Sequence, residues 1–579
     1  MIVLRTVLFL ASLLGYLGWL SRRMLPEFVP AVLFSSIGCL MLLAALCGAS
    51  GAGAVAVCLT GLLLLGFALR KRESFRGLLC FSNGFLLVLC LYFLWNLYGI
   101  RLTGYDDFSH WGVITRILIT QDRLPDSGDV LLSFQSYPPG MALLIYWAVK
   151  IVGINEEWFW LYTQAVLTMS MYMGLFAFTQ TRRERWFMCV CILILLCSNT
   201  FFINLLVDGV VTAAALGSMC FCLWYTHTSE GNRVGDRKAV LFWLIPQMAF
   251  LLLVKNSGVF FALIPALYLL FKSENTEDRR RGIVLMLLSL MPVLLWRWHV
   301  RSVFPEGMLS KHALSWGYLS NTITDKTVQG MKYILAKLLN RLFSPKTELV
   351  WLLAFSGLAA YSGRSLLRRR DSLLRAVLSV DLLAGLFYVF FLYLMYLFAM
   401  PWYEASLLAG FERYLRTFTA YACGLMSLAL PEIWRDGGGS AQRLHLRSAL
   451  MAGWVLLIAL SMGRRYDFYL KWPMDGEPRT ALEAVIAEHS VLPGKNYLIV
   501  IGDENEDREY LQYMARYVLN SEQVTVLTPE ELHEKTDCEG EADYVIAWDW
   551  NDEIRKQLSP EFGLQPDRVI ALEKVTEQL

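Results

Sequence analysis

Apolar runs of about 17–25 residues recur along most of the chain, separated by short polar or basic segments. Runs of this length match the roughly 30 Å hydrocarbon core of a bilayer, so each predicts a membrane-spanning helix. They recur too often for a single anchor. We therefore predict a polytopic α-helical membrane protein with about 14 spans, at residues 2–20, 28–48, 52–69, 77–97, 157–179, 186–204, 207–227, 239–254, 257–272, 283–300, 347–363, 375–399, 414–433 and 447–463.

Basic side chains between these runs predict the orientation of the chain, because Lys and Arg favour cytoplasmic loops. All the basic loops fall on one side only if residues 137–152 do not cross the membrane. This segment is apolar but short, and it opens with Pro138-Pro139. We predict a juxtamembrane or re-entrant helix that begins and ends outside. The expected outer side then carries residues 98–156, a short loop at 204–208, residues 301–346, the loop near 400–413 and the C-terminal tail.

The tail differs from the rest of the chain in charge and pattern. Residues 474–579 contain 24 acidic and 9 basic side chains, whereas the whole protein carries a formal charge of +2. Strand-like runs at 497–501, 524–527, 544–548 and 569–572 alternate with helical patterns at 480–490 and 506–519, which favours a small α/β domain with a parallel sheet. The predicted regions are N-terminal transmembrane helices (1–97), an outer loop with an acidic motif and juxtamembrane helices (98–156), a transmembrane core (157–465) with a second outer loop at 301–346, and a soluble acidic extracytoplasmic domain (474–579).

The positions of the cysteines favour neither a disulfide-linked domain nor a zinc-binding domain. Eleven of the twelve cysteines lie in apolar segments, and neither a CxxC pair nor a Cys/His zinc spacing occurs. A disulfide framework and a structural zinc site are therefore not expected.

The first large outer loop contains the sequence GYDDFSHWG, with adjacent carboxylates beside the membrane. Such charges are costly unless they are solvated, paired or used. Asp106 or Asp107 and His110 lie three or four residues apart and would share one helical face. A carboxylate there could act as a general base on an acceptor hydroxyl, and Asp with His could hold a divalent cation. The alternative is that one aspartate only caps the following helix.

Further charged residues fall on the same predicted side. Asp208 begins a span, Lys255 lies between two apolar helices, and Arg413 lies where the chain re-enters the membrane. Lys255 could be a snorkelling anchor or a phosphate contact, and Arg suits bidentate phosphate binding. An interfacial pair between Glu412 and Arg416 is an alternative for that helix. Positive charge in the second outer loop comes from Arg297, His299, Arg301, Lys311 and His312.

This ordered series resembles the GT-C superfamily of polyprenyl-phosphate-sugar-dependent glycosyltransferases, such as protein O-mannosyltransferases and lipid A aminoarabinose transferases. The similar features are Tyr105-Asp106-Asp107 in the first outer loop, Tyr137-Pro138-Pro139-Gly140, Gly153-Ile154-Asn155-Glu156, Asp208 at the start of a span, and Lys255. The resemblance covers residues 98–300, with weaker support to about 420. The sequence departs from the pattern in having four spans before the acidic loop and Asn256-Ser257 after the lysine.

The resemblance implies that Asp106 or Asp107 is the base and that an acceptor hydroxyl displaces polyprenyl phosphate with inversion. Cations would stabilise the departing phosphate. A divalent metal ion is the one cofactor that the acidic and histidine side chains suggest. The candidate binding residues are Asp208, Lys255, Arg413, Arg301, His110 and Tyr137, and the candidate metal ligands are Asp107, His110 and Asp208.

The expected partners are the bilayer, a polyprenyl-phosphate-linked sugar and an envelope glycan, glycolipid or protein acceptor, with no nucleic acid. The expected location is a bacterial plasma membrane. Three alternatives remain open: an envelope polysaccharide polymerase or ligase, a glycolipid transporter or flippase, and a structural scaffold. A transporter would need ionisable groups inside spans, and Asp381 is one such group.

Overall fold

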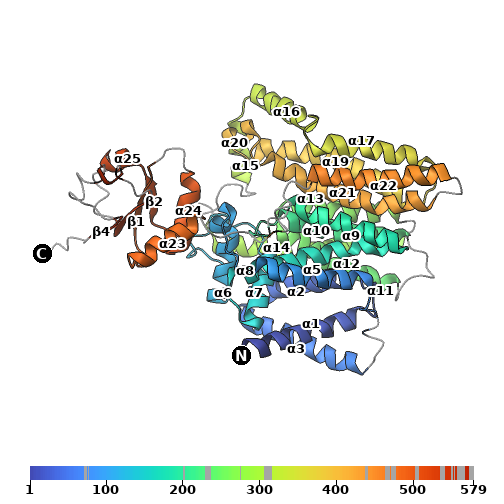
Figure 1. Ribbon diagram of the computed structural model, residues 1–579, viewed down its shortest axis with the longest axis horizontal. Coiled ribbons are helices and arrows are strands. Elements are labelled where there is room, and N and C mark those ends of the chain that lie inside the picture. Colours follow the sequence, from blue (N-terminus) through green and yellow to red (C-terminus); the bar gives the residue numbers. More distant parts are fainter. Residues whose placement is uncertain are drawn as a thin grey trace.

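The computed structural model describes most of the chain. The described residues are 1–70, 75, 77–199, 202–227, 237–273, 276–305, 316–436, 441–462, 470, 477–502, 507–534, 542–548, 552, 554–556, 558 and 568–572. Figure 1 shows helices running alongside one another in a large bundle, with a small sheet-containing domain beyond one end.

The bundle is built from helices whose positions follow the apolar runs. They are α1 (Ile2–Leu20), α2 (Val29–Leu46), α3 (Ser50–Leu69), α5 (Phe81–Leu97), α6 (Gly112–Gln121), α7 (Gly140–Val152), α8 (Glu157–Tyr172), the 3-10 helix η2 (Met173–Phe178), α9 (Arg182–Asn199), α10 (Asp208–His227), α11 (Arg237–Phe242), α12 (Leu244–Val254), α13 (Gly258–Lys272), α14 (Thr276–Val303), α15 (Trp316–Thr324), α16 (Val328–Leu342), α17 (Glu348–Ser362), α18 (Arg364–Leu367), α19 (Leu373–Phe398), α20 (Trp402–Leu407), α21 (Phe411–Arg435) and α22 (Ala441–Met462).

Seven helices within the described residues are long and apolar enough to cross a membrane: α1, α2, α3, α8 with η2, α10, α14 and α19. Shorter apolar helices lie at 81–97, 140–152, 240–254, 258–272, 348–362 and 447–461. The chain is therefore a largely helical membrane protein. The number of crossings and their orientation stay predictions.

The segment at 137–152 has its predicted helix, α7, which is almost entirely enclosed. Met141 to Val149 are all buried, and α7 packs on α2, α6 and α8. Gly140 lets α7 approach α12 closely, because a Cβ there would lie 2.6 Å from the Leu253 carbonyl oxygen of α12. Whether α7 crosses the membrane stays a prediction.

The C-terminal domain contains a four-stranded sheet in the order β2-β1-β3-β4. Its strands are β1 (Tyr497–Val500), β2 (Val524–Leu527), β3 (Tyr544–Ala547) and β4 (Val569–Ala571). β1 pairs in parallel with β2 and β3, whereas β4 runs antiparallel to β3. The sheet is therefore mixed rather than wholly parallel. Its helices are α23 (Pro478–Glu488), α24 (Arg508–Leu519) and α25 (Pro529–Glu534).

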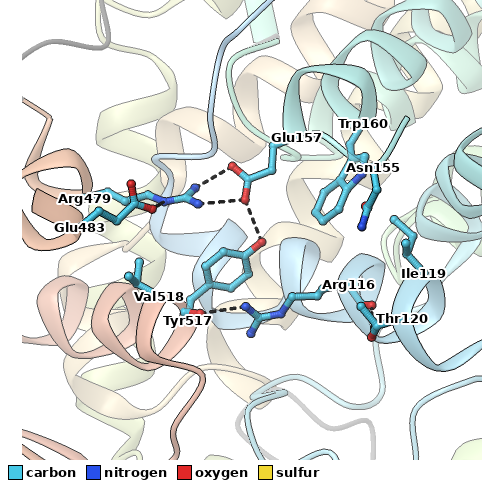
Figure 2. A pocket seen from close by; sticks show the side chains of 10 residues that line it. All are labelled: Arg116, Ile119, Thr120, Asn155, Glu157, Trp160, Arg479, Glu483, Tyr517 and Val518. Carbon is cyan, nitrogen blue, oxygen red and sulfur yellow. Dashed lines mark hydrogen bonds and ion pairs between the residues drawn. The ribbon is translucent and has the colours of Figure 1, made fainter. Parts of the chain in front are cut away.

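Helices α23 and α24 dock this domain onto the bundle. Arg479 donates to both Glu157 carboxylate oxygens, at 2.7 and 3.1 Å, and Tyr517 donates to the same carboxylate at 3.1 Å (Figure 2). The Arg479 side chain is 8% exposed and that of Glu157 15%. Arg101 pairs with Glu483 beside them. The docked domain therefore covers the loop that carries the acidic motif.

Candidate functional site

The acidic motif forms a single π-helical turn, η1 (Asp107–Trp111), leading into α6. Its two aspartates point to different surroundings. The Asp107 side chain is fully buried and accepts from the Gly104 amide at 3.0 Å and the Leu205 amide at 2.7 Å, one on each oxygen. A Cβ at Gly104 would lie 2.8 Å from Asp107 Oδ2, so a larger residue would disturb this bond. Asp107 therefore ties the motif to the loop that precedes α10.

Burial raises the pKa of Asp107 to about 8; its two amide donors act against the rise, and the Asp106 and Glu157 carboxylates add to it. A carboxyl that titrates near neutrality would suit a general base. However, Asp107 has no exposed surface and does not line the cavity described below. Its position suits a structural role better than proton transfer to a bound molecule.

Asp106 belongs instead to a chain of alternating charges. Arg413 donates to Asp106 at 2.8 Å, and its Nε lies 3.8 Å from Asp208 Oδ2. Lys255 donates to the other Asp208 oxygen at 2.8 Å. Among the described atoms, neither Arg413 Nε nor Asp208 Oδ2 has a hydrogen-bond partner. Two carboxylates and two cations from distant segments therefore meet here, and two of their polar atoms make no hydrogen bond to the described atoms.

Breaks between helices place these side chains. Lys255 adopts an extended backbone between α12 and α13, and the following turn closes with the Gly258 amide donating to the Lys255 carbonyl at 2.9 Å. Only glycine fits that turn, since a Cβ would lie 2.2 Å from the Leu251 carbonyl oxygen. Gly410, with φ of +69°, similarly begins α21 just before Arg413. Local backbone requirements thus position both cations.

Asp106, Lys255 and Arg413 line a cavity of about 470 Å³, whereas Asp208 is not among its lining residues. Helix α24 contributes Glu509 and Tyr513 to the lining, so the cavity lies at the end of the bundle nearest the C-terminal domain, called here the docking end. Its lining combines charged and aromatic side chains from the first loop, the α12–α13 turn, the start of α21 and helix α24. The lining residues are Tyr105, Asp106, His110, Trp111, Ser133, Phe134, Tyr137, Leu206, Lys255, Met400, Glu404, Ala409, Gly410, Arg413, Tyr414, Glu509 and Tyr513.

One wall of the cavity is aromatic. The Tyr137 ring stacks on Trp111 and Phe134, with centroids 5.5 and 5.4 Å away, and His110 contacts all three rings. Burial lowers the pKa of His110 to about 3 and raises that of Tyr137. His110 Nδ1 lies 2.8 Å from the Ser109 hydroxyl. Both side chains are therefore uncharged at neutral pH, and they pack with the neighbouring rings.

The predicted metal ligands do not form a suitable donor set in this arrangement. Both Asp107 oxygens accept backbone amides, and one Asp208 oxygen accepts from Lys255. No group of three or more His, Cys, Asp or Glu side chains that could hold a metal ion occurs within the described part of the chain.

Several other predicted cations lie elsewhere. Arg301 is exposed near the end of α14 and does not line the cavity. His299 contacts the Pro125 carbonyl oxygen at 3.1 Å. Arg416 pairs with Glu348 at 3.3 Å, and Glu412 lies 3.9 Å from Arg341. Lys311 and His312 fall outside the described residues.

The cavity residues that sequence reasoning did not single out include four polar or charged ones with a place in the argument below: Tyr105, Glu404, Glu509 and Tyr513. Tyr105 donates to Glu509 at 2.8 Å and contacts the Tyr513 ring at 5.2 Å. Glu509 and Tyr513 lie four residues apart on α24, so one helical face presents both. The amphipathic pattern of this helix could have indicated a packing face, but nothing in the sequence indicates what that face packs against.

Comparisons with known proteins give little further guidance. No protein-family model and no curated protein matches the chain. The crystal structure of ArnT from Cupriavidus metallidurans bound to undecaprenyl phosphate is similar over 85% of this chain and 98% of that chain, with 14% identity and a TM-score of 0.37. A likeness this weak transfers neither a residue role nor an activity.

Proposed function

We propose that the chain is a membrane glycosyltransferase that moves a sugar from a polyprenyl-phosphate donor to an envelope acceptor. The observation that carries this proposal is the convergence of Asp106, Lys255 and Arg413 on one cavity at the docking end. An anionic lipid-linked donor needs cations beside the membrane, and an acceptor hydroxyl needs a base within reach. One cavity here offers both.

The charge chain suggests how the donor would prepare the base. Before binding, Arg413 is paired with Asp106, and Asp208 holds Lys255. The donor phosphate would take over Arg413 and Lys255, which would free Asp106 to accept the acceptor's hydroxyl proton. The acceptor oxygen then bonds to the anomeric carbon as the carbon–oxygen bond to phosphate breaks. The leaving polyprenyl phosphate keeps that electron pair between the two cations, which lowers the barrier to its departure.

The remaining lining suits the acceptor. Glu404 and Glu509 present carboxylates that can accept hydroxyl hydrogens, and Tyr105 and Tyr513 present aromatic faces. We propose that α24 of the C-terminal domain forms part of the acceptor side. The orientation with the docking end outside the cytoplasm follows from the distribution of Lys and Arg between loops.

The test is transfer by the reconstituted full chain supplied with a panel of polyprenyl-phosphate sugars and an envelope extract as acceptor. Asp106→Asn and Lys255→Ala are expected to abolish most transfer, whereas Arg301→Gln serves as a matched loss of one positive charge outside the cavity. Full transfer by Asp106→Asn would overturn the proposed base.

A transport function draws support from one different observation. Asp381 lies within α19, and neither of its carboxylate oxygens has a hydrogen-bond partner among the described residues. Carboxylates inside spans often belong to ion or substrate paths. Loss of lipid translocation in Asp381→Asn, with no transfer activity in the wild type, would favour the transporter.

A further inference from the structure

A second cavity lies between α13 and α19, with a volume of about 680 Å³. Its lining is almost wholly apolar except at one end, where three cations gather. Its lining residues are Phe260, Leu263, Ile264, Leu267, Tyr268, Phe271, Lys272, Arg370, Arg375, Ala376, Ser379, Val380, Leu383, Ala384, Phe387 and Phe391. None of them lines the cavity at the docking end.

The two helices face each other through matching stripes. On α13 the lining positions recur every three or four residues from Phe260 to Phe271, and on α19 they recur in the same way from Ala376 to Phe391. The α19 stripe includes the small, buried residues Ala376 and Ala384, which give the groove its depth. The groove is therefore a continuous feature of both helices.

Its ends are chemically different. Towards the docking end, the Phe260 ring contacts the Tyr388 and Phe391 rings, with centroids 5.1 and 5.7 Å away, which closes the groove. At the other end, Lys272 is the last residue of α13, and its Nζ donates to the Arg370 carbonyl oxygen at 3.5 Å. Arg375 lies in the first turn of α19. The groove thus pairs an apolar length with a cationic mouth.

The open side of the groove carries large apolar side chains. Phe271 is 86% exposed, Leu383 57% and Phe387 56%, so this face of the bundle needs an apolar surrounding. Lipid tails would cover any such face in a membrane. Lys272, Arg370 and Arg375 also line the groove, and their positive charge complements an anionic lipid headgroup.

The length of the groove fits a lipid whose chains cross one leaflet. From Phe260 to Phe271 the stripe covers 11 helical steps, or about 16 Å at 1.5 Å per residue. This is close to one leaflet, about half of a 30 Å hydrocarbon core. A glycerophospholipid places its phosphate at the leaflet edge and its chains across that depth.

We propose that this groove is a binding site for an anionic glycerophospholipid. Its phosphate lies between Lys272, Arg370 and Arg375, and its acyl chains lie between α13 and α19. The site is separate from the proposed donor cavity, whose cations are at the docking end. It does not depend on the transferase activity.

The test is native mass spectrometry of the purified full chain in detergent with phosphatidylglycerol and phosphatidylcholine of identical acyl chains. The wild type is expected to retain phosphatidylglycerol more strongly. Arg375→Gln is expected to weaken its retention about fivefold, equivalent to about 1 kcal/mol for one surface cation. The control is Arg364→Gln, which removes a nearby arginine that stacks on Tyr361 outside the groove and should change nothing.

A shape variant tests the apolar half independently. Ser379 is exposed in the groove, so Ser379→Trp fills it without displacing a packed side chain and should lower phosphatidylglycerol retention with all cations present. Equal retention of the two lipids by the wild type would overturn the proposal, as would equal losses in Arg375→Gln and Arg364→Gln. Stronger, Arg375-dependent retention of a polyprenyl monophosphate would assign the groove to a different lipid and also overturn it.

Discussion

The two adjacent aspartates should respond differently to the same substitution. In Asp107→Asn, the new side chain keeps one oxygen acceptor, so only one of the amides of Gly104 and Leu205 can be satisfied. The other amide would face the Asn NH₂ group inside a fully buried site. An unsatisfied buried donor costs about 1–3 kcal/mol, so we expect a lower unfolding temperature and a displaced loop before Asp208.

Asp106→Asn should have the opposite profile. The Asp106 and Arg413 side chains are 22% and 37% exposed, so losing their ion pair should cost about 1 kcal/mol or less. Loss of a general base should lower the transfer rate by about 10²–10⁴-fold. Thermal unfolding followed by tryptophan fluorescence, beside the transfer assay, separates the two effects. A stable, inactive Asp107→Asn together with an active Asp106→Asn would refute this division of roles.

Three further substitutions test other parts of the structure. The folded-state pKa of His110 is lowered to about 3, so its contribution to stability is present above about pH 6.5 and is lost as the pH falls towards 3. His110→Gln should therefore reduce the difference in unfolding temperature between pH 7 and pH 4.5. Arg479→Met leaves Glu157 without its positively charged partner and should cost about 3–5 kcal/mol of docking energy, seen as faster proteolytic release of the C-terminal domain. An unchanged cleavage rate would contradict this. The control is Arg568→Met, which removes an arginine that donates to the Ala547 and Trp548 carbonyl oxygens within the C-terminal domain. Lys326 donates to the carbonyl oxygens of Thr322, Leu397 and Met400, so Lys326→Met should lower the unfolding temperature, and an unchanged value would show that these bonds do not hold the α19–α20 loop.

The helices were largely predictable from the sequence because apolar length and basic boundaries carry most of the signal in a membrane protein. The expected runs at 2–20 and 207–227, for example, correspond to α1 and α10. The four strands of the tail were also expected near their observed positions. The direction of β4 was not, since pairing direction depends on a connection through residues whose pattern does not specify it.

The site was predictable only in part. Charge and position pointed to Asp106, Asp208, Lys255 and Arg413, and the structure brings these four together. The sequence could not show which of Asp106 and Asp107 faces the cavity, because the directions of two adjacent side chains depend on the backbone geometry of η1. Arg301 shares the predicted side but lies outside the cavity. The contribution of α24 depends on domain docking, which no local pattern encodes.

The most direct test of the central claim is the affinity of the purified chain for a polyprenyl monophosphate, the product that the cavity is proposed to release. Titration should show binding in the wild type and in Arg301→Gln, with an affinity at least tenfold weaker in both Lys255→Gln and Arg413→Gln, since charge-assisted contacts contribute about 1.5–3 kcal/mol each. Equal affinity in the wild type and both cavity variants would contradict the assignment of this cavity to a lipid-linked phosphate.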